Sequence, residues 1–387
     1  MIQRRHHLAL LAAAALLAGG AQAQSDTVKI GVILPMTGQQ ASTGRQIDAA
    51  IKLWVAQNGK KVAGKNVEVI VKDDASTPDQ TRRLAQELIV NDKVVALAGF
   101  GITPSAMATA PLATQSKTPM VVMAAATSAI TEASPYVVRS SFTLPQAAVG
   151  MAEWANKNGI KKTVTLVADY GPGFDAEKYF ADRVTLNGGQ VLDKLRTPLR
   201  APDFAPVLQK VRDSKPDALF VFLPSGQGAA FMKQFAERGL DKAGIRLIAT
   251  GDVTDDDQLN DMGDVAVGVV NAHHYSAAHP SALNKKFVAD FMAANKFRPN
   301  FMAVGGYDGM RVIYKALEAS KGQGGDALLA GMKGQIFESP RGKVYIDGQT
   351  RDIVHDMYIR KVERKDGQLW NIEFDAIKEM KDPGKSK

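Results

Sequence analysis

The chain has 387 residues and contains no cysteine. This absence excludes disulfide bonds, thiolate catalysis and cysteine-ligated metal sites. The fold must therefore be held together by its hydrophobic core, and a chain of this length can bury a large one. Hydrophobic residues make up 45% of the chain and charged residues 23%, which is the composition of a globular protein rather than of a disordered one.

Long hydrophobic runs are also missing. The longest unbroken run, Leu8–Leu17, has ten residues, whereas a membrane-spanning helix needs about 20. The run follows a pair of arginines and precedes Ala21–Ala23, the small-x-small pattern at which signal peptidase cuts. We therefore expect residues 1–23 to be a cleaved signal peptide and the mature protein to be soluble in the periplasm. An uncleaved membrane anchor is the alternative.

The sequence also lacks a surface-forming stripe of residues of one charge. The chain has 48 Lys and Arg against 40 Asp and Glu, a net charge of +8. The basic residues are scattered, and they form no stripe interleaved with aromatic residues. This pattern argues against a nucleic acid partner.

Complete enzyme motifs are absent. Gly99-Phe100-Gly101 and Gly226-Gln227-Gly228 each lack the third glycine of a dinucleotide-binding fingerprint. The sequence has no nucleophile elbow, phosphate-binding loop or His-Glu-x-x-His helix. We therefore expect a protein without a cofactor and without catalytic activity.

Metal-binding patterns are weak. His273 and His274 are adjacent, so we expect their side chains to point apart, and a loop cluster with His279 is favoured over a metal site. The acidic run Asp255–Asp257 is expected to cap the helix that reaches Leu259, because negative charge is favourable at a helix N-terminus.

Short apolar strands alternate with helical patterns along most of the chain. Such repetition predicts a parallel sheet with helices on both faces, and the pattern restarts near residues 140–144. The sequence therefore predicts two doubly wound α/β lobes. The strands are expected at 28–34, 67–71, 94–98 and 120–123 in the first series and at 163–168, 218–223 and 246–249 in the second.

The elements after His273 are too few for a third domain, so we expect the chain to cross back and complete both lobes. Several crossings between two α/β lobes make a hinge and a cleft. The expected boundaries are 24–141 plus 275–345 for the first lobe, 142–274 plus 346–382 for the second, and a disordered tail at 383–387.

Ligands of open parallel sheets bind beyond the carboxyl ends of the strands. The segments at these positions are rich in Gly, Ser and Thr, and several of them begin helices, whose free N–H groups suit a carboxylate. We therefore expect the ligand site in segments 35–44, 99–105, 124–128, 169–174, 224–228 and 251–254.

At this point the sequence resembles the leucine/isoleucine/valine-binding family, the type I periplasmic binding proteins of ABC importers. The resemblance implies a Venus-flytrap fold, in which two lobes joined by three strands close over a small ligand and present it to a membrane permease. It is carried by an ordered series: Ile30-Gly31-Val32, Met36-Thr37-Gly38 with Gly44, Asp73-Asp74 with Pro78, Pro119, Ala126-Thr127, Asp169-Tyr170-Gly171, Arg238-Gly239-Leu240 and Tyr307-Asp308.

The resemblance also implies a site for the carboxylate of the ligand. Hydroxyl and backbone N–H groups bind this carboxylate in the family, and the matching positions here are Thr103 or Ser105, Ala125 and Thr127. Uncharged donors at a helix start can hold a carboxylate without a counter-charge. Thr43 matches a position that lines the side-chain pocket.

The second lobe departs from the family. Tyr170 matches an aromatic residue that contacts the ligand, but a second ligand-contacting tyrosine falls near Pro224 or Ser225, neither of which can stack or donate as a phenol does. The acidic residue that holds the ligand ammonium falls on Gly251, with Asp252 one position away. The ligand is therefore either an α-amino acid held by Asp252 or a carboxylate that lacks the amine, such as an aromatic or aliphatic acid.

The main expectation is a monomeric, non-enzymatic binding component of an ABC importer for a small carboxylate, with a branched-chain or other amino acid first and an aromatic acid second. Two alternatives belong to other classes. One is a secreted α/β hydrolase that uses Ser105 or Ser225, and the other is a ligand module that partners a sensory receptor.

Overall fold

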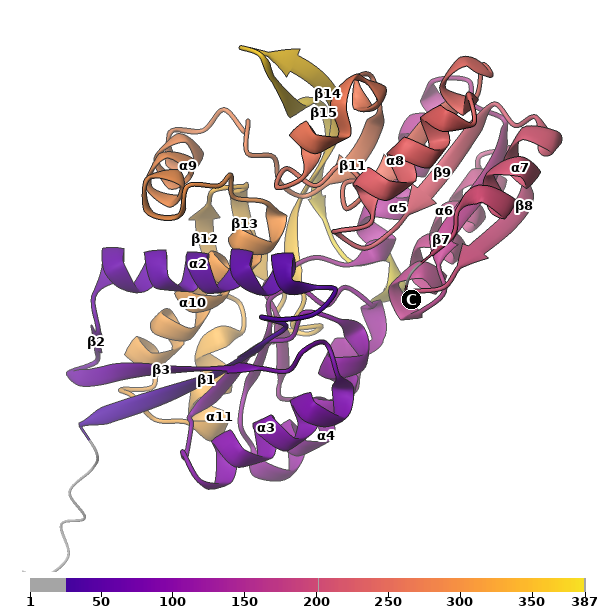
Figure 1. Ribbon diagram of the computed structural model, residues 1–387. Helices are drawn as coiled ribbons and strands as arrows, with labels where there is room; N and C mark the ends of the chain where they lie inside the picture. Colours follow the sequence, from indigo (N-terminus) through magenta and orange to yellow (C-terminus); the bar gives the residue numbers. More distant parts are fainter. Residues whose placement is uncertain (1–25, 201, 386–387) are drawn as a thin grey trace, which may run out of the picture.

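The computed structural model describes residues 26–200 and 202–385. It has two lobes, each built on a largely parallel sheet with helices on both faces (Figure 1). The predicted fold class is thus confirmed. The predicted signal peptide lies outside the described residues. No helix in the described residues is both long enough and apolar enough to span a membrane.

The first lobe forms around β1, whose side chains from Ile30 to Leu34 are buried. Its strands run in the order β2 (Lys61–Val62), β3 (Lys65–Asp73), β1 (Thr27–Leu34), β4 (Ala96–Gly99), β5 (Met120–Val122), β6 (Val137–Arg139). All these pairs are parallel except β2 with β3. The helices of this lobe are α2 (Ala41–Asn58), α3 (Pro78–Val90), α4 (Thr103–Ser116), α10 (Phe301–Ala319) and α11 (Gly325–Met332).

The second lobe begins with the parallel strands β8 (Gln190–Thr197), β7 (Lys162–Ala168), β9 (Ala218–Phe222), β10 (Arg246–Thr250) and β11 (Val270–His273), in that order. Antiparallel strands continue the sheet: β14 (Ile353–Lys365), β15 (Gln368–Met380), β13 (Gly342–Ile346) and β12 (Ile336–Ser339). The helices are α5 (Leu144–Lys157), α6 (Gly171–Leu186), α7 (Ala205–Ser214) and α8 (Gly228–Glu237), while α9 (Ala282–Asn295) packs against α2 of the first lobe.

Alternate side chains of β9 enter two separate cores. Phe220 and Phe222 face the core that includes Phe180 of α6, whereas Leu219 and Val221 face the core that includes Phe231 of α8. A strand that is buried on both faces reads as a continuous apolar run, and this is why the sequence predicts it correctly.

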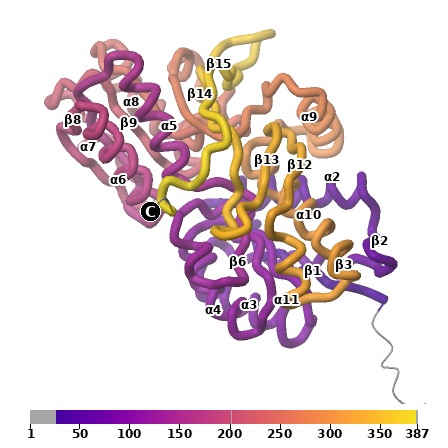
Figure 2. The backbone as a smooth tube through the Cα atoms, turned by 180° about the vertical axis from the view of Figure 1, so that it is seen from behind, coloured from indigo at the N-terminus to yellow at the C-terminus, as the bar shows by residue number. Residues whose placement is uncertain are grey.

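Within the described residues, three segments carry the chain between the lobes: 139–144, 273–282 and the start of β14 (Figure 2). The last of these is a strand that pairs with β13 at one end and with β11 further along. This hinge has the three connections that the family resemblance implies. The exact lobe boundaries stay a prediction.

A buried arginine joins the hinge segments. Arg341, between β12 and β13, is fully buried and its Nε and Nη2 donate to Oδ2 of Asp308 in α10, at 3.0 and 2.6 Å. Its Nη1 donates to the carbonyl of Ser141 at 2.7 Å and lies 2.9 Å from Nδ1 of His274. A single guanidinium therefore contacts two of the crossing segments and a helix of the first lobe.

Two local predictions differ from the structure. Residues 383–385, expected to be disordered, form a short 3-10 helix in which Nζ of Lys385 donates to Oγ1 of Thr131 at 2.6 Å. The rest of that tail lies outside the described residues. Strand β8 is absent from the prediction because it is an edge strand with mixed polar and apolar residues and only partial burial.

Candidate functional site

A narrow cavity of about 30 Å³ lies between the lobes. It is formed where β4, β5, β9 and β10 end, as expected for parallel sheets. Among the residues that the structure describes, Asp252 is the only charged one that lines it. The lining residues are Gln40, Gly101, Ile102, Thr103, Ala124, Ala125, Ala126, Phe142, Leu144, Tyr170, Pro172, Phe222, Pro224, Ser225, Asp252 and Met302.

Two helix N-termini, one from each lobe, meet at one end of the cavity. Helix α4 begins at Thr103 and α6 begins at Gly171, and the first N–H groups of a helix have no partner inside it. Oγ1 of Thr103 lies 2.9 Å from Oγ1 of Thr127. A Cβ atom on Gly171 would come within 2.9 Å of the same Thr127 oxygen, so the two helix starts approach closely. Two helix starts and two hydroxyl groups favour an anion here.

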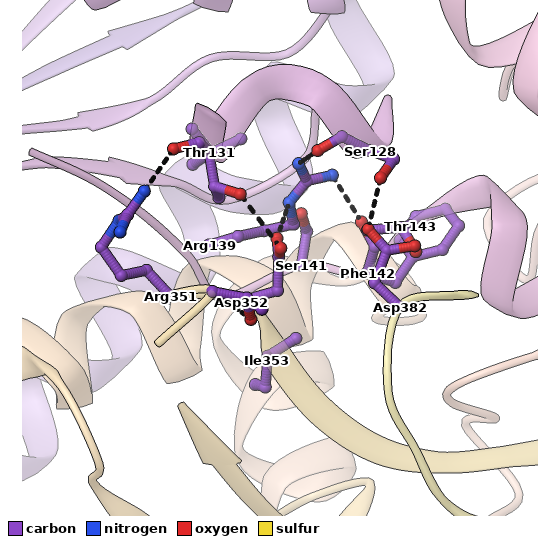
Figure 3. Close-up of polar contacts among 12 residues, drawn as sticks. Ser128, Thr131, Arg139, Ser141, Phe142, Thr143, Arg351, Asp352, Ile353 and Asp382 are labelled. Atoms are coloured by element: carbon purple, nitrogen blue, oxygen red, sulfur yellow. Dashed lines mark hydrogen bonds and ion pairs between the residues drawn. The ribbon is translucent and has the colours of Figure 1, made fainter. Parts of the chain in front are cut away.

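A buried arginine, Arg139, fixes the loop that carries Ala125 and Thr127. Figure 3 shows Arg139 among Ser128, Phe142 and Asp352, which it also contacts. Arg139 donates through Nη1 to the carbonyl of Ala125 at 3.3 Å and through Nη2 to that of Thr127 at 2.7 Å. Its Nε lies 2.9 Å from Oδ1 of Asp352, at the start of the third crossing. The loop conformation is therefore tied to the hinge. The N–H of Ala125 is already occupied, because it donates to the carbonyl of Phe100 at 3.0 Å.

The structure brings five of the eight predicted site residues together in the cavity lining and leaves Thr43, Ser105 and Thr127 outside it, although the hydroxyl of Thr127 contacts that of Thr103. Ser105 is fully buried and its hydroxyl lies 2.7 Å from Oγ1 of Thr81 and 3.3 Å from Oδ2 of Asp74. Thr43 does not line the cavity, and its γ-methyl group lies near the place that a Cβ on Gly101 would take. The hydroxyl of Ser105 thus makes contacts inside the first lobe and does not face the cavity.

Aromatic side chains form much of the cavity wall. The ring of Tyr170 stacks on that of Phe222, with 6.1 Å between centroids and 19° between planes. Burial, together with the nearby charge of Asp252, raises the pKa of the Tyr170 hydroxyl, so this group stays protonated. Phe142, from the first crossing, completes the wall.

The second-lobe side of the cavity contains a crowded glycine. A Cβ atom on Gly251 would lie 2.1 Å from Nη2 of Arg360 and 2.6 Å from the ring of His273, so no larger residue fits. Arg360 is buried, and its Nε donates to Oδ1 of Asn271 at 2.7 Å. Burial lowers the pKa of Arg360, while the negative charges of Asp256, Glu373 and Asp252, in decreasing order of effect, raise it.

The prediction that Asp255–Asp257 caps the next helix is wrong. Both carboxylate oxygens of Asp255 accept from Nδ2 of Asn300, at 2.8 and 2.9 Å. Burial, reinforced by the charge of Asp257, raises the pKa of Asp255 to about 7. Oδ2 of Asp257 accepts from Oγ of Ser42 and from Nη2 of Arg45, both at 2.6 Å. Ser42 and Arg45 belong to the first lobe, so the acidic run holds the two lobes together.

This contact predicts the effect of Asp257→Ala. The variant should weaken the binding of every ligand by about 3- to 10-fold, because it removes interactions that exist only when the lobes are closed. Titration calorimetry with two unlike ligands measures the effect. The control is Asp264→Ala, since Asp264 is exposed and pairs with Arg364 of its own lobe. A loss confined to one ligand would show that Asp257 acts on the ligand and not on closure.

The prediction that His273 and His274 point apart is also wrong. Their ring centroids are 4.5 Å apart, and both rings pack on Phe142. His274 lies just beyond β11, where the strict alternation of a strand no longer holds. His279 is separate and bonds Glu373 at 2.8 Å. The described residues contain no group of three or more side chains that could hold a metal ion.

The chain is similar to known proteins over most of its length. A family model described as periplasmic binding protein matches residues 27–368. The chain is 42% identical to a Leu/Ile/Val-binding protein homolog from Brucella abortus over 383 residues, which cover 97% of this chain and 98% of the relative.

Two solved structures from Rhodopseudomonas palustris are similar over almost the whole chain. One is a solute-binding protein of an ABC transporter in complex with 3,4-dihydroxybenzoic acid, at 61% identity and a TM-score of 0.92, covering 94% of this chain and 100% of that one. The other, in complex with 4-hydroxybenzoate, has 42% identity and a TM-score of 0.90, covering 93% and 99%.

Proposed function

This chain belongs to the periplasmic binding protein family, and we propose that within it the chain binds an aromatic carboxylic acid for an ABC importer. It is a non-enzymatic solute-binding component. The sequence alone favours an amino acid as the ligand, and this becomes the second candidate here. It is retained because Asp252, an acidic residue that could bind an ammonium group, lines the cavity.

The main observation that supports an aromatic acid over an amino acid is the position of Arg360 next to Gly251. An α-amino acid has an ammonium group, which needs an uncompensated carboxylate in a buried site. Position 251, where the resemblance places that carboxylate, has no room for a side chain because Arg360 and His273 fill the space. The one acidic residue of the cavity, Asp252, already lies in the field of Arg360. An ammonium group would therefore be held near a buried guanidinium, and like charges repel.

The remaining lining suits an aromatic ring. Tyr170, Phe222 and Phe142 offer ring faces and edges, which stabilise an aromatic ligand in preference to a branched aliphatic one. The helix starts at Thr103 and Gly171 offer uncharged donors for its carboxylate. The aromatic acids bound by the two R. palustris proteins support the same ligand class.

The mechanism is closure of the hinge. Ligand bridges the two lobes and raises the population of the closed form in proportion to its higher affinity for that form. The closed form is then recognised by a membrane permease, which the family implies. Export by cleavage after residue 23 and a monomeric state belong to the same proposal.

Thermal unfolding with a panel of ligands tests the proposed function. Benzoate or a hydroxylated benzoate at 100 times its dissociation constant should stabilise the protein by about 2.7 kcal/mol. Leucine, isoleucine and phenylalanine should have no effect, because each carries an ammonium group. Benzamide is the matched control, since it keeps the ring and loses the carboxylate charge. Stabilisation by leucine, with none by the aromatic acids, would replace this proposal by the amino-acid one.

A further inference from the structure

Only one of the two carboxylate oxygens of Asp252 accepts a hydrogen bond from a described residue. Asp252 follows β10 and is 4% exposed. Its Oδ2 accepts from Oγ1 of Thr250 at 2.9 Å, whereas its Oδ1 has no hydrogen-bond partner among the described residues and is not sealed off from the cavity. His273 does not satisfy it, because Nε2 of His273 lies 3.6 Å from Oδ2. Burial also lowers the pKa of His273 to about 4, so its ring is neutral near pH 7.

A buried carboxylate with a free oxygen requires a donor from the ligand. Leaving such a group without a partner on ligand binding is costly, because closure removes the water that would otherwise solvate it. Arg360 lies behind Gly251 and does not line the cavity. No described residue that lines the cavity donates to Oδ1 of Asp252, so a ligand in the cavity is placed to supply the donor.

The same carboxylate orients the ligand. Two carboxylates repel, so the carboxylate of the ligand lies away from Asp252 and close to the first-lobe hydroxyl of Thr103, which the hydroxyl of Thr127 contacts from outside the lining. The group at the other end of the ligand then faces the second lobe. A benzene ring holds its substituents at fixed positions. A donor in the para or meta position relative to the carboxylate therefore reaches Asp252.

We propose that Asp252 accepts a hydrogen bond from a ring hydroxyl, so that the cavity selects hydroxylated benzoates over benzoate. This inference rests on the proposed function and names the subgroup of aromatic acids that the site takes. A phenol fits better than an ammonium because it donates without adding positive charge near Arg360. A hydrogen bond to a carboxylate is also stronger than one between neutral groups.

Titration calorimetry with four acids tests the assignment. Benzoate, 3-hydroxybenzoate, 4-hydroxybenzoate and 4-methoxybenzoate are each titrated into the protein and into Asp252→Ala and Asp252→Asn. The unmodified protein should bind at least one hydroxybenzoate about 10- to 100-fold more tightly than benzoate or the methoxy acid, which cannot donate. The comparison of the 3- and 4-isomers shows which ring position meets Asp252.

Asp252→Ala should lose this preference and bind benzoate as tightly as the unmodified protein or more tightly. Asp252→Asn keeps a neutral acceptor and should retain part of the preference. Benzoate binding by each variant reports an intact cavity, and Asp264→Ala is the surface control.

Different failures have different meanings. A hydroxyl preference that survives Asp252→Ala, or one that is absent from the unmodified protein, overturns the role of Asp252 and leaves the aromatic-acid function standing. Binding of none of the four acids overturns the proposed function itself.

Discussion

Replacing Arg341 with methionine is expected to lower the free energy of unfolding by about 3–5 kcal/mol, which is the usual cost of removing one partner from a buried ion pair. The variant leaves the carboxylate of Asp308 buried without its cation, and both side chains are fully buried. It also frees the carbonyl of Ser141, which the guanidinium binds at 2.7 Å. Chemical denaturation followed by circular dichroism measures the change.

Two comparisons separate burial from charge in this result. Arg364→Met removes a pair whose side chains are 47% and 85% exposed, so it should change stability by about 0–1 kcal/mol. Arg341→Met combined with Asp308→Leu should recover much of the loss, because no buried charge remains. If Arg341→Met alone were as stable as the unmodified protein, water would have to reach Asp308, and the hinge would be looser than the contacts indicate.

Replacing Tyr170 with alanine should weaken the binding of an aromatic acid by about 100-fold, or about 3 kcal/mol. The change removes a ring that stacks on Phe222 and lines the cavity, and truncation of a buried aromatic side chain costs about 3–5 kcal/mol. Fluorescence or calorimetric titration with 4-hydroxybenzoate measures the loss.

Tyr170→Phe separates the ring from the hydroxyl group. It should retain most of the affinity if the ring contact dominates, as the stacking indicates. Phe174→Ala is the matched control, because Phe174 is an aromatic residue in the first turn of α6, the helix that Tyr170 precedes, and it is 43% exposed and does not line the cavity. Equal losses for Tyr170→Ala and Phe174→Ala would trace the effect to the helix and not to the cavity.

Much of this site could be predicted from the sequence because of one geometric rule. Most of the lining residues lie in the segments that follow parallel strands, where the sequence analysis expects them. The rule misses Phe142, Leu144, Phe222 and Met302. Phe142 and Leu144 lie on the first crossing segment, Phe222 is the last residue inside β9, and Met302 lies in the first turn of a helix far along the chain. None of these positions has a local pattern that differs from ordinary core.

Side-chain direction was the second limit of prediction. Thr103 and Ser105 are two residues apart on one helix, and the resemblance allows either as the carboxylate donor. Only the structure shows that Ser105 is held by Asp74 and Thr81 while Thr103 lines the cavity. The role of Arg360 was invisible for a similar reason, since the residue is more than a hundred positions from Gly251 in the sequence.

The contact of Arg360 with Gly251 also restricts how this binding site can change its specificity by mutation. An acidic side chain at position 251 collides with the guanidinium group, while removal of Arg360 alone leaves Asn271 and the carbonyl of Tyr275 without their donor. Conversion to an amine-binding pocket therefore needs both substitutions together, and each single intermediate is less stable than its parent. Selection that acts one mutation at a time would therefore tend to preserve the amine-free specificity that we propose.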